Sequence, residues 1–370
     1  MHTAQLVRAT DGPNSNLSDL RAFGEELDRL KERTLGRVGA VDVRRLRRLE
    51  TFSIAMEVVG RLLIQFSPEP ITFVTGVFAL FVHKQLQAIE IGHTVLHGAY
   101  DRLAGTRGHH SKRYRWDIPI DEASWREGHN VRHHGTTNVA GKDPDLEFGP
   151  VRLTAHTPYV WYHGWQLWLT LGLIVPNFTM LMNGHFTGLG EDAPKGGLRG
   201  AWWRTIRKFV PYYLENYLLF PLLAGPLFFK VLLGNWLAET MRDVYSAATI
   251  FCGHVGHDVR SFPEGTRPTS RGEWYAMQVE SSNDFEVSRP LAVLCGGLER
   301  QIEHHLFPTL PPDRLREIAP EVRAICARHG VTYRTASWGR TLRGAVAQIA
   351  LLARNRGLPP APAREASARG

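Results

Sequence analysis

Histidines gather in four short segments of this chain. Of its 17 histidines, two stand in HTVLH, three in HNVRHH, two in HVGH and two at the end of QIEHH. Neutral imidazole binds iron, copper, zinc and nickel, so clusters of this kind indicate a metal site. The clustered residues are His93, His97, His129, His133, His134, His254, His257, His304 and His305.

The spacing inside these clusters predicts two metal ions. Residues four apart lie on nearly the same face of a helix, so the two histidines of HTVLH, and the first two of HNVRHH, can each aim at one point. Adjacent residues diverge by about 100° on a helix. The HH pairs of HNVRHH and QIEHH therefore suit two ions lying side by side better than a single ion.

Acidic residues beside the clusters complete the predicted centre. Two divalent cations among neutral imidazoles keep a large positive charge, and carboxylates behind the ligands should offset it and orient the rings. The acidic candidates are Asp101, Glu127, Asp143, Asp145, Asp258, Glu299 and Glu303. The remaining histidines lack such spacing, and we interpret His83, His109, His110, His156, His163, His185 and His329 as surface or hydrogen-bonded residues.

Apolar segments must position the clusters. Residues 70–82 follow a shorter apolar stretch, 52–66, and the Ser-Pro-Glu-Pro break between them predicts a helical hairpin. Residues 153–190 contain no Asp, Glu, Lys or Arg, and residues 209–238 contain only Glu215 and Lys230 as charged groups. A membrane-spanning helix needs about 20 largely apolar residues, which none of these runs supplies without interruption. The mean hydropathy of −0.22 by itself favours a large buried core in a soluble helical protein, but a polar catalytic cap would dilute the hydropathy of membrane helices in the same way. The pattern of apolar segments favours membrane integration.

Composition excludes several other classes of protein. The net charge of +8 comes partly from short basic clusters beside apolar runs, such as Arg204, Arg207 and Lys208; these suit an anionic membrane surface, and we expect no nucleic-acid binding. Three separated cysteines favour neither a disulfide framework nor a cysteine zinc site. Strand signals are few, so the chain is predicted to be mainly α-helical. Residues 312–330 look helical with a break at Pro320, and the Pro/Ala-rich tail looks disordered.

Three of the histidine clusters resemble the histidine boxes of membrane fatty acid desaturases, HxxxH, HxxxHH and QxxHH, in the same order. The surrounding words WREGHNVRHHGTTNVAGKDPDL and GGLERQIEHHLFPTLP are similar to the second and third box regions, as is QVESSNDF upstream of the third. The resemblance covers roughly residues 70 to 320, with QIEHHLFP its most specific part.

The resemblance implies an all-α integral membrane helix bundle, of about four transmembrane helices, with a cytoplasmic helical cap that holds a His-rich di-metal site. It implies a di-iron centre of two iron ions. His257 matches a family ligand at the end of the last membrane helix and is preferred to His254, which remains an added ligand or a neighbour of the ligands. The implied ligands are His93, His97, His129, His133, His134, His257, His304 and His305, and the further candidates at or behind the metals are His254, Asn283, Asp101, Glu127, Asp143, Asp145 and Glu303.

The implied activity is that of a fatty acid desaturase, which introduces a double bond into an acyl chain with O2 and two electrons. Removal of hydrogen from an unactivated methylene needs an oxidant stronger than any side chain. The expected substrate is an acyl-CoA, acyl-carrier-protein or acyl-lipid. No HPGG haem motif occurs in the sequence, so the resemblance implies a separate electron donor, of the ferredoxin or cytochrome b5 type with its reductase. Residues 161–168 and 209–238 are expected either to line the acyl tunnel or to face lipid.

The organisation predicted from the sequence has four parts: an N-terminal cytoplasmic segment (1–50), a membrane desaturase domain with its catalytic cap (51–320), C-terminal cytoplasmic helices (321–356) and the tail (357–370). Three other functions stay open. They are a di-iron hydroxylase or oxygenase that acts on a lipid, sterol or carotenoid, a zinc-dependent membrane hydrolase in which three histidines hold one ion, and a non-enzymatic membrane protein.

Overall fold

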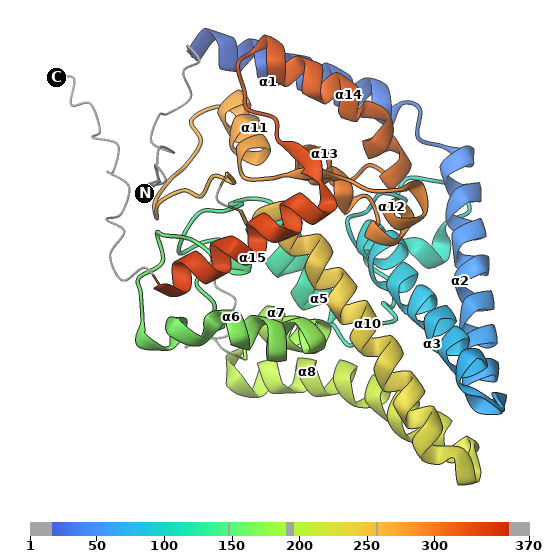
Figure 1. The fold of residues 1–370 in the computed structure, drawn as a ribbon. Helices are drawn as coiled ribbons and strands as arrows, with labels where there is room; N and C mark the ends of the chain where they lie inside the picture. Colours follow the sequence, from blue (N-terminus) through green and yellow to red (C-terminus); the bar gives the residue numbers. More distant parts are fainter. Residues whose placement is uncertain (1–16, 147–148, 190–195, 257, 355–370) are drawn as a thin grey trace.

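The computed structural model describes residues 17–146, 149–189, 196–256 and 258–354. Helices dominate these residues (Figure 1), and two short strands, β1 (Asp284–Glu286) and β2 (Thr335–Ser337), pair in parallel. The prediction of a mainly α-helical chain is therefore confirmed. The predicted tail and His257 lie outside the described residues.

Two long helical hairpins extend from one side of the molecule. In the first, α2 (Ala40–Phe66) and α3 (Pro70–Gln85) meet at the predicted break. The Glu69 carboxylate accepts hydrogen bonds from the backbone N–H groups of Ile71 and Thr72, and Pro70 occupies the first turn, where its missing N–H costs nothing. In the second, α8 (Gly197–Leu214) continues through η8 (Glu215–Leu219) and α9 (Phe220–Leu223), and α10 (Phe228–His254) returns beside α3 (Figure 1).

A buried polar cluster joins the two hairpins. Lys84 of α3 lies 2.9 Å from the Glu239 carboxylate of α10, and Arg242 lies 2.5 Å from the same carboxylate. Tyr212 of α8 donates a hydrogen bond of 2.6 Å to Glu239. Charges removed from water are stable only when paired in this way, so the cluster fixes how α3, α8 and α10 face one another.

The cap is built from shorter helices above the hairpins. α1 (Leu17–Leu35) packs on α11 (Arg271–Glu280) and α14 (Pro312–Arg328) (Figure 1). The predicted break at Pro320 is wrong, because α14 runs through it with Ile318 and Val322 buried in the cap core. The remaining cap helices are α4 (Thr94–Leu96), η2 (Arg107–His109), α5 (Glu122–Trp125), η4 (Pro144–Leu146), α12 (Arg289–Cys295), η10 (Leu298–Arg300), α13 (Gln301–Leu306) and α15 (Trp338–Arg354).

Residues Trp161–Thr187 form one helical segment of 27 residues, and among the described helices it alone is long and apolar enough to cross a membrane by length and composition. It comprises η5 (Trp161–Trp165), α6 (Gln166–Leu169), η6 (Thr170–Ile174), η7 (Val175–Asn177) and α7 (Phe178–Thr187). Only 33% of its most apolar window is buried within the molecule.

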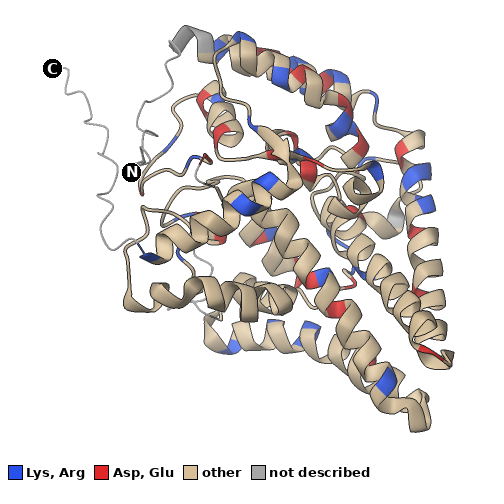
Figure 2. Ribbon diagram, in the orientation of Figure 1, with Lys and Arg blue, Asp and Glu red and all other residues tan. Residues whose placement is uncertain are grey.

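Large apolar side chains are exposed along both hairpins. Ile71 and Phe229 are each 78% exposed, and Phe66 and Leu223 are each 67% exposed. Figure 2 shows that Lys, Arg, Asp and Glu gather in the cap and are sparse on the far ends of the hairpins. A contiguous apolar surface of this extent marks a site of contact with membrane or protein. We call this surface the apolar belt; its exposed residues include Phe52, Ile54, Val58, Leu62, Phe66, Ile71, Val74, Phe78, Leu214, Leu218, Leu222, Leu223, Phe229, Leu233 and Trp236.

Candidate metal centre

The first two histidine clusters begin at or within π-helices. α3 continues directly into η1 (Leu86–His93), and α5 continues into η3 (Arg126–His133). Between His93 and His97 the backbone is α-helical, with His97 N–H bonded to the His93 carbonyl oxygen, and the two rings meet as the spacing predicts. The α-helical geometry assumed from spacing is wrong for HNVRHH, which lies on η3. The wider π turn frees carbonyl groups, and the indole N–H of Trp116 lies 3.0 Å and 3.1 Å from the carbonyl oxygens of Gln87 and Ala88.

A glycine precedes a clustered histidine in four places, and in three of them a large side chain packs where a Cβ would stand. A Cβ on Gly92 would lie 1.9 Å from the Trp116 indole nitrogen. On Gly128 it would lie 2.4 Å from the Phe186 ring, and on Gly253 it would lie 2.7 Å from Gln301. These three glycines therefore let neighbouring side chains brace the backbone next to His93, His129 and His254.

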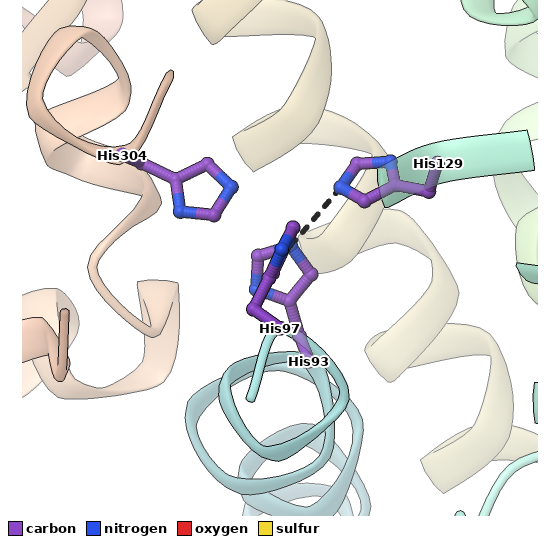
Figure 3. A group of neighbouring side chains, drawn as sticks. All are labelled: His93, His97, His129 and His304. Carbon is purple, nitrogen blue, oxygen red and sulfur yellow. Dashed lines mark hydrogen bonds between the residues drawn. The ribbon is translucent and has the colours of Figure 1, made fainter. Parts of the chain in front are cut away.

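Four histidines from three remote segments meet at one point, which we call imidazole group one: His93, His97, His129 and His304. Figure 3 shows the four rings converging from the η1–α4 segment and the residue after it, from η3 and from α13. The Nε2 atoms of His93 and His97 are 3.2 Å apart, and those of His93 and His129 are 3.4 Å apart. Nitrogens bound to one ion at about 2 Å lie at comparable separations, so the group has the dimensions of a metal site.

Three more histidines form imidazole group two: His133, His254 and His305. The Nε2 atoms of His254 and His305 are 2.9 Å apart, and the His133 ring centroid lies 4.8 Å from that of His254. The adjacent residues His304 and His305 thus belong to different groups, the arrangement that the sequence predicts for a pair lying between two ions.

The other HH pair gives a mixed result. The His134 ring lies between the groups, 4.3 Å from the ring of His305 and 4.8 Å from the ring of His97. His129 and His133 were expected to aim at one point, yet they fall in different groups. The Nδ1 atoms of both rings face Asp145, with which the two histidines form a third cluster.

Hydrogen bonds hold the rings of group two. His133 Nδ1 lies 2.9 Å from the Asp143 carboxylate, and His305 Nδ1 lies 3.0 Å from the Gln278 side-chain oxygen. His254 Nδ1 lies 3.3 Å from the Ser281 carbonyl oxygen. Because each partner is an acceptor, each ring donates from Nδ1 and turns Nε2 toward the centre, as metal-binding histidines do.

Burial and charge decide the protonation of these rings. Burial lowers the pKa of His129, His304 and His305 well below the ordinary value, and the neighbouring imidazoles add to the shift. Burial alone would also lower the pKa of His133, but the charges of Asp143 and Asp145 outweigh it and raise that pKa to about 9. Most of the cluster is thus neutral, which is the form that binds metals.

Several ring nitrogens are buried without a hydrogen-bond partner among the described residues. They are Nε2 of His133 and His304 and both ring nitrogens of His134. Each such atom would be costly to bury without compensation. Metal coordination supplies the missing partner, so the residues present fit a pair of metal ions.

The predicted carboxylates divide into two sets. Asp143 contacts a ring directly, and Asp145 lies 3.7 Å from His129 Nδ1 and 3.5 Å from His133 Nδ1. The others have different surroundings: Asp101 accepts hydrogen bonds from Ser111, Glu299 pairs with Arg316, Glu303 bonds Tyr333, and Glu127 and Asp258 are exposed. Asn283 is buried near Gly256, and its side-chain oxygen has no hydrogen-bond partner among the described residues.

Sequence reasoning missed three residues of the centre. Gln301 contacts His254 at 2.7 Å between Nε2 atoms, and Gln278 supports His305. The Trp125 ring stacks on His129 with centroids 4.5 Å apart. The glutamine of QIEHH and the first residue of QVESSNDF were visible in the sequence, but nothing there assigned them partners. The preference for His257 over His254 stays a prediction, because His257 lies outside the described residues.

A mostly apolar cavity ends at the two imidazole groups. Its walls come from α7, α10, the loop before α5 and the π-helices. The predicted tunnel lining by residues 161–168 or 209–238 is wrong for the described part of this cavity; Trp161, Trp165 and Trp168 instead point outward, at 62–77% exposed. The lining residues are Ala88, Ile89, His93, Trp116, Ile118, Ile120, Trp125, His129, His133, Asp145, Phe178, Thr179, Met182, Phe186, Ser246, Ile250, His254, Leu298 and Gln301.

Comparison with known proteins places these features in a family. Residues 68–337 match the family model described as fatty acid desaturase. An NADPH-dependent stearoyl-CoA 9-desaturase of Mycobacterium tuberculosis is 32% identical over 345 residues, which cover 88% of this chain and 79% of that protein. An sn-1 linoleoyl-lipid 6-desaturase of Arthrospira platensis is 25% identical, with 62% and 66% of the two chains covered. A Delta(5) fatty acid desaturase A of Dictyostelium discoideum is 24% identical, with 70% and 58% covered.

Proposed function

Because this chain belongs to the fatty acid desaturase family, we propose that it desaturates a long acyl chain carried as the CoA thioester, at two iron ions held by imidazole groups one and two. The observation that carries this proposal is the apolar cavity ending at two adjacent imidazole groups. Acyl desaturation itself is the activity of the family. The CoA carrier is supported by the Mycobacterium tuberculosis relative, which is named for a stearoyl-CoA substrate.

The chemistry divides between the metal pair and the chain. When bound, the irons supply an O2-derived oxidant strong enough to remove hydrogen from an unactivated methylene. The histidines of the two imidazole groups would hold the ions, with Asp143 and Gln278 orienting two of the rings. The cavity binds the acyl chain by burying its methylenes, at about 0.8 kcal/mol for each CH2, and its apolar wall excludes water from the reacting carbons.

Expression in a host that lacks the activity tests the proposal. Fatty-acid profiling with location of the double bond should reveal a new olefin, and purified protein should contain iron. A product that retains oxygen would instead favour a hydroxylase. One zinc ion per chain with no iron would favour the hydrolase alternative.

We further propose that the apolar belt is embedded in a bilayer. The crossing segments would be α2, α3, the continuous α8–η8–α9 segment and α10, and the cap would face the cytoplasm. Exposed Trp161, Trp165, Trp202 and Trp203 would then lie at the membrane–water boundary, where tryptophan is enriched. The segment Trp161–Thr187 would lie along that boundary rather than supply one of the four crossings.

Cysteine labelling tests this topology. The three native cysteines are buried, so a membrane-impermeant maleimide should report only an introduced cysteine. Thr72→Cys at the α2–α3 turn should label from outside intact cells, and Arg29→Cys on α1 should label only after lysis. Labelling of both from the same side would contradict the proposed topology.

A further inference from the structure

Desaturation needs electrons that the substrate does not supply. Two C–H bonds break and one C=C bond forms, which releases two electrons and two protons. Reduction of O2 to two water molecules consumes four of each. The other two electrons and protons must come from outside, so a reduced carrier has to approach the metal centre. This need for a carrier rests on the proposed function.

A second pocket reaches the metal centre from the side of the cap. It lies between the loop after η3, the loop before α11 and α11 itself, and its lining includes Thr136, Thr137, Lys142, Arg267, Trp274 and Gln278. α11 lies in the cap, far from the turn between α2 and α3 (Figure 1). With the apolar belt in the bilayer, this pocket would be open to a soluble protein.

The floor of this pocket touches a predicted metal ligand. Gln278 Oε1 lies 3.0 Å from His305 Nδ1, and Thr137 Oγ1 lies 3.2 Å from the same nitrogen. Thr137 also donates a hydrogen bond of 2.9 Å to Gln278. A single layer of side chains therefore separates the pocket from the His305 imidazole.

The rim of the pocket is positively charged. Lys142 is half-buried and Arg267 is exposed, and neither forms an ion pair with another described residue. Two acidic side chains stand nearby without lining the pocket: Glu264 beside Gly141, and Glu273, which accepts a hydrogen bond from Thr269. Half-buried Trp274 adds an aromatic surface of the kind that anchors protein interfaces.

We propose that this pocket is the docking site for a one-electron carrier protein with an acidic surface around its redox centre, and that electrons enter the metal centre beside His305. Lys142 and Arg267, which form no ion pair with the described residues, select an acidic partner. The phosphates of the substrate's CoA are a poorer fit for this pocket. A CoA bound there would have to connect to the acyl chain, yet the pocket shares no lining residue with the acyl cavity.

Binding and kinetics with a defined carrier test the proposal. The full chain is reconstituted in nanodiscs, and the probe is a [2Fe–2S] ferredoxin of net negative charge, reduced by NADPH and a ferredoxin reductase. The variant is Lys142→Glu/Arg267→Glu. The matched control is Arg29→Glu/Arg323→Glu, which reverses two exposed cap cations that pair with no other described residue.

The Kd for ferredoxin and its KM should each rise at least about tenfold in the Lys142/Arg267 variant, and their dependence on ionic strength should weaken. The control and the charge-conserving Lys142→Arg/Arg267→Lys variant should behave like the wild type. Olefin formed after reduction by dithionite should be unchanged, which also shows that the variant folds; if the double variant does not fold, Arg267→Ala alone is measured for a smaller rise.

Three results would overturn the proposal: no salt-sensitive binding of ferredoxin to the wild type, the same loss in the control, or a rise in KM for acyl-CoA in place of the rise for ferredoxin. Failure of the proposed function is distinguishable from these. The wild type would then give no olefin even with dithionite, while the binding measurement would still decide on the docking site.

Discussion

The two imidazole groups differ in how their rings are held. In group two, Asp143, Gln278 and Ser281 accept from the outer nitrogens of the three rings. In group one, the ring nitrogens of His93 and His97 come within hydrogen-bond distance only of other imidazole nitrogens among the described residues. Group two is thus oriented by the protein before metal binds, whereas group one depends more on packing and on the ion itself.

Removal of a ligand from each group should have the largest effect. His304→Ala and His305→Ala change adjacent residues of α13 that belong to different groups. Each should lower desaturation more than about 100-fold, since even supporting residues of metal sites are worth 10- to 100-fold. Metal analysis should show His304→Ala losing the ion of group one and His305→Ala that of group two. His329→Ala, which removes a cap histidine paired with Glu26, is the control; loss of both ions in both variants would remove the distinction between the groups.

Asp143→Asn should come next. It keeps an acceptor for His133 but removes the buried charge that raises the pKa of this ring. We expect metal affinity in group two to fall about 10- to 100-fold, with group one unaffected, as measured by titration of the metal-free protein. Asp101→Asn, which alters a cap carboxylate bonded to Ser111, should leave both affinities unchanged. An equal loss in the two groups would show that the charge acts on the whole centre.

Gln278→Leu should have a smaller effect, because His305 keeps Thr137 as a neighbour. The expected loss in group two affinity is about tenfold. Gln166→Leu offers a matched control, since Gln166 is also buried and bonded to carbonyl groups, at Arg152 and Ile349. Only the first variant should alter metal binding, although both should lower the thermal midpoint.

Trp125→Leu should give the smallest effect, confined to group one. Stacking on His129 is worth about 1 kcal/mol, which corresponds to about fivefold in metal affinity. Trp161→Leu, at a site 77% exposed, controls for the loss of an indole. If Trp125→Leu changed affinity as much as Asp143→Asn does, packing and hydrogen bonding would support the two groups equally.

The residues that meet at the centre could be predicted from the sequence because spacing carries that information. HTVLH, HNVRHH and QIEHH marked seven histidines, and the structure brings all seven together. The hairpin at residues 67–70 was also predictable, because Glu69 and Pro70 determine only the backbone within a few residues of their own positions.

The partners of these residues could not be predicted, because they come from remote segments. The contacts of Trp116 with the Gln87 carbonyl, of Gln301 with His254 and of Gln278 with His305 join positions 27 to 47 apart. His129 and His133 fall in different imidazole groups and meet only in the cluster with Asp145, on a backbone that is a π-helix and not the α-helix assumed from spacing. The helix break predicted at Pro320 was wrong for a related reason, because the packing of α14 on the cap core outweighs the local tendency of proline to end a helix.

The π-helix η1 lies between a part of the helix that exposes apolar side chains and a part that directs histidine rings to the metal centre. From Pro70 to His97 one continuous helical segment presents exposed apolar side chains at one end and the rings of His93 and His97 at the other. In a uniform α-helix, the rotation of about 100° per residue would fix the direction of the histidine rings relative to the exposed apolar face. The wider turns of η1 rotate the histidine rings relative to the exposed apolar face of α3. On the proposed membrane topology, side chains on the outer face of α3 would therefore be able to change to match a thicker or thinner bilayer while the aim of His93 and His97 stays the same.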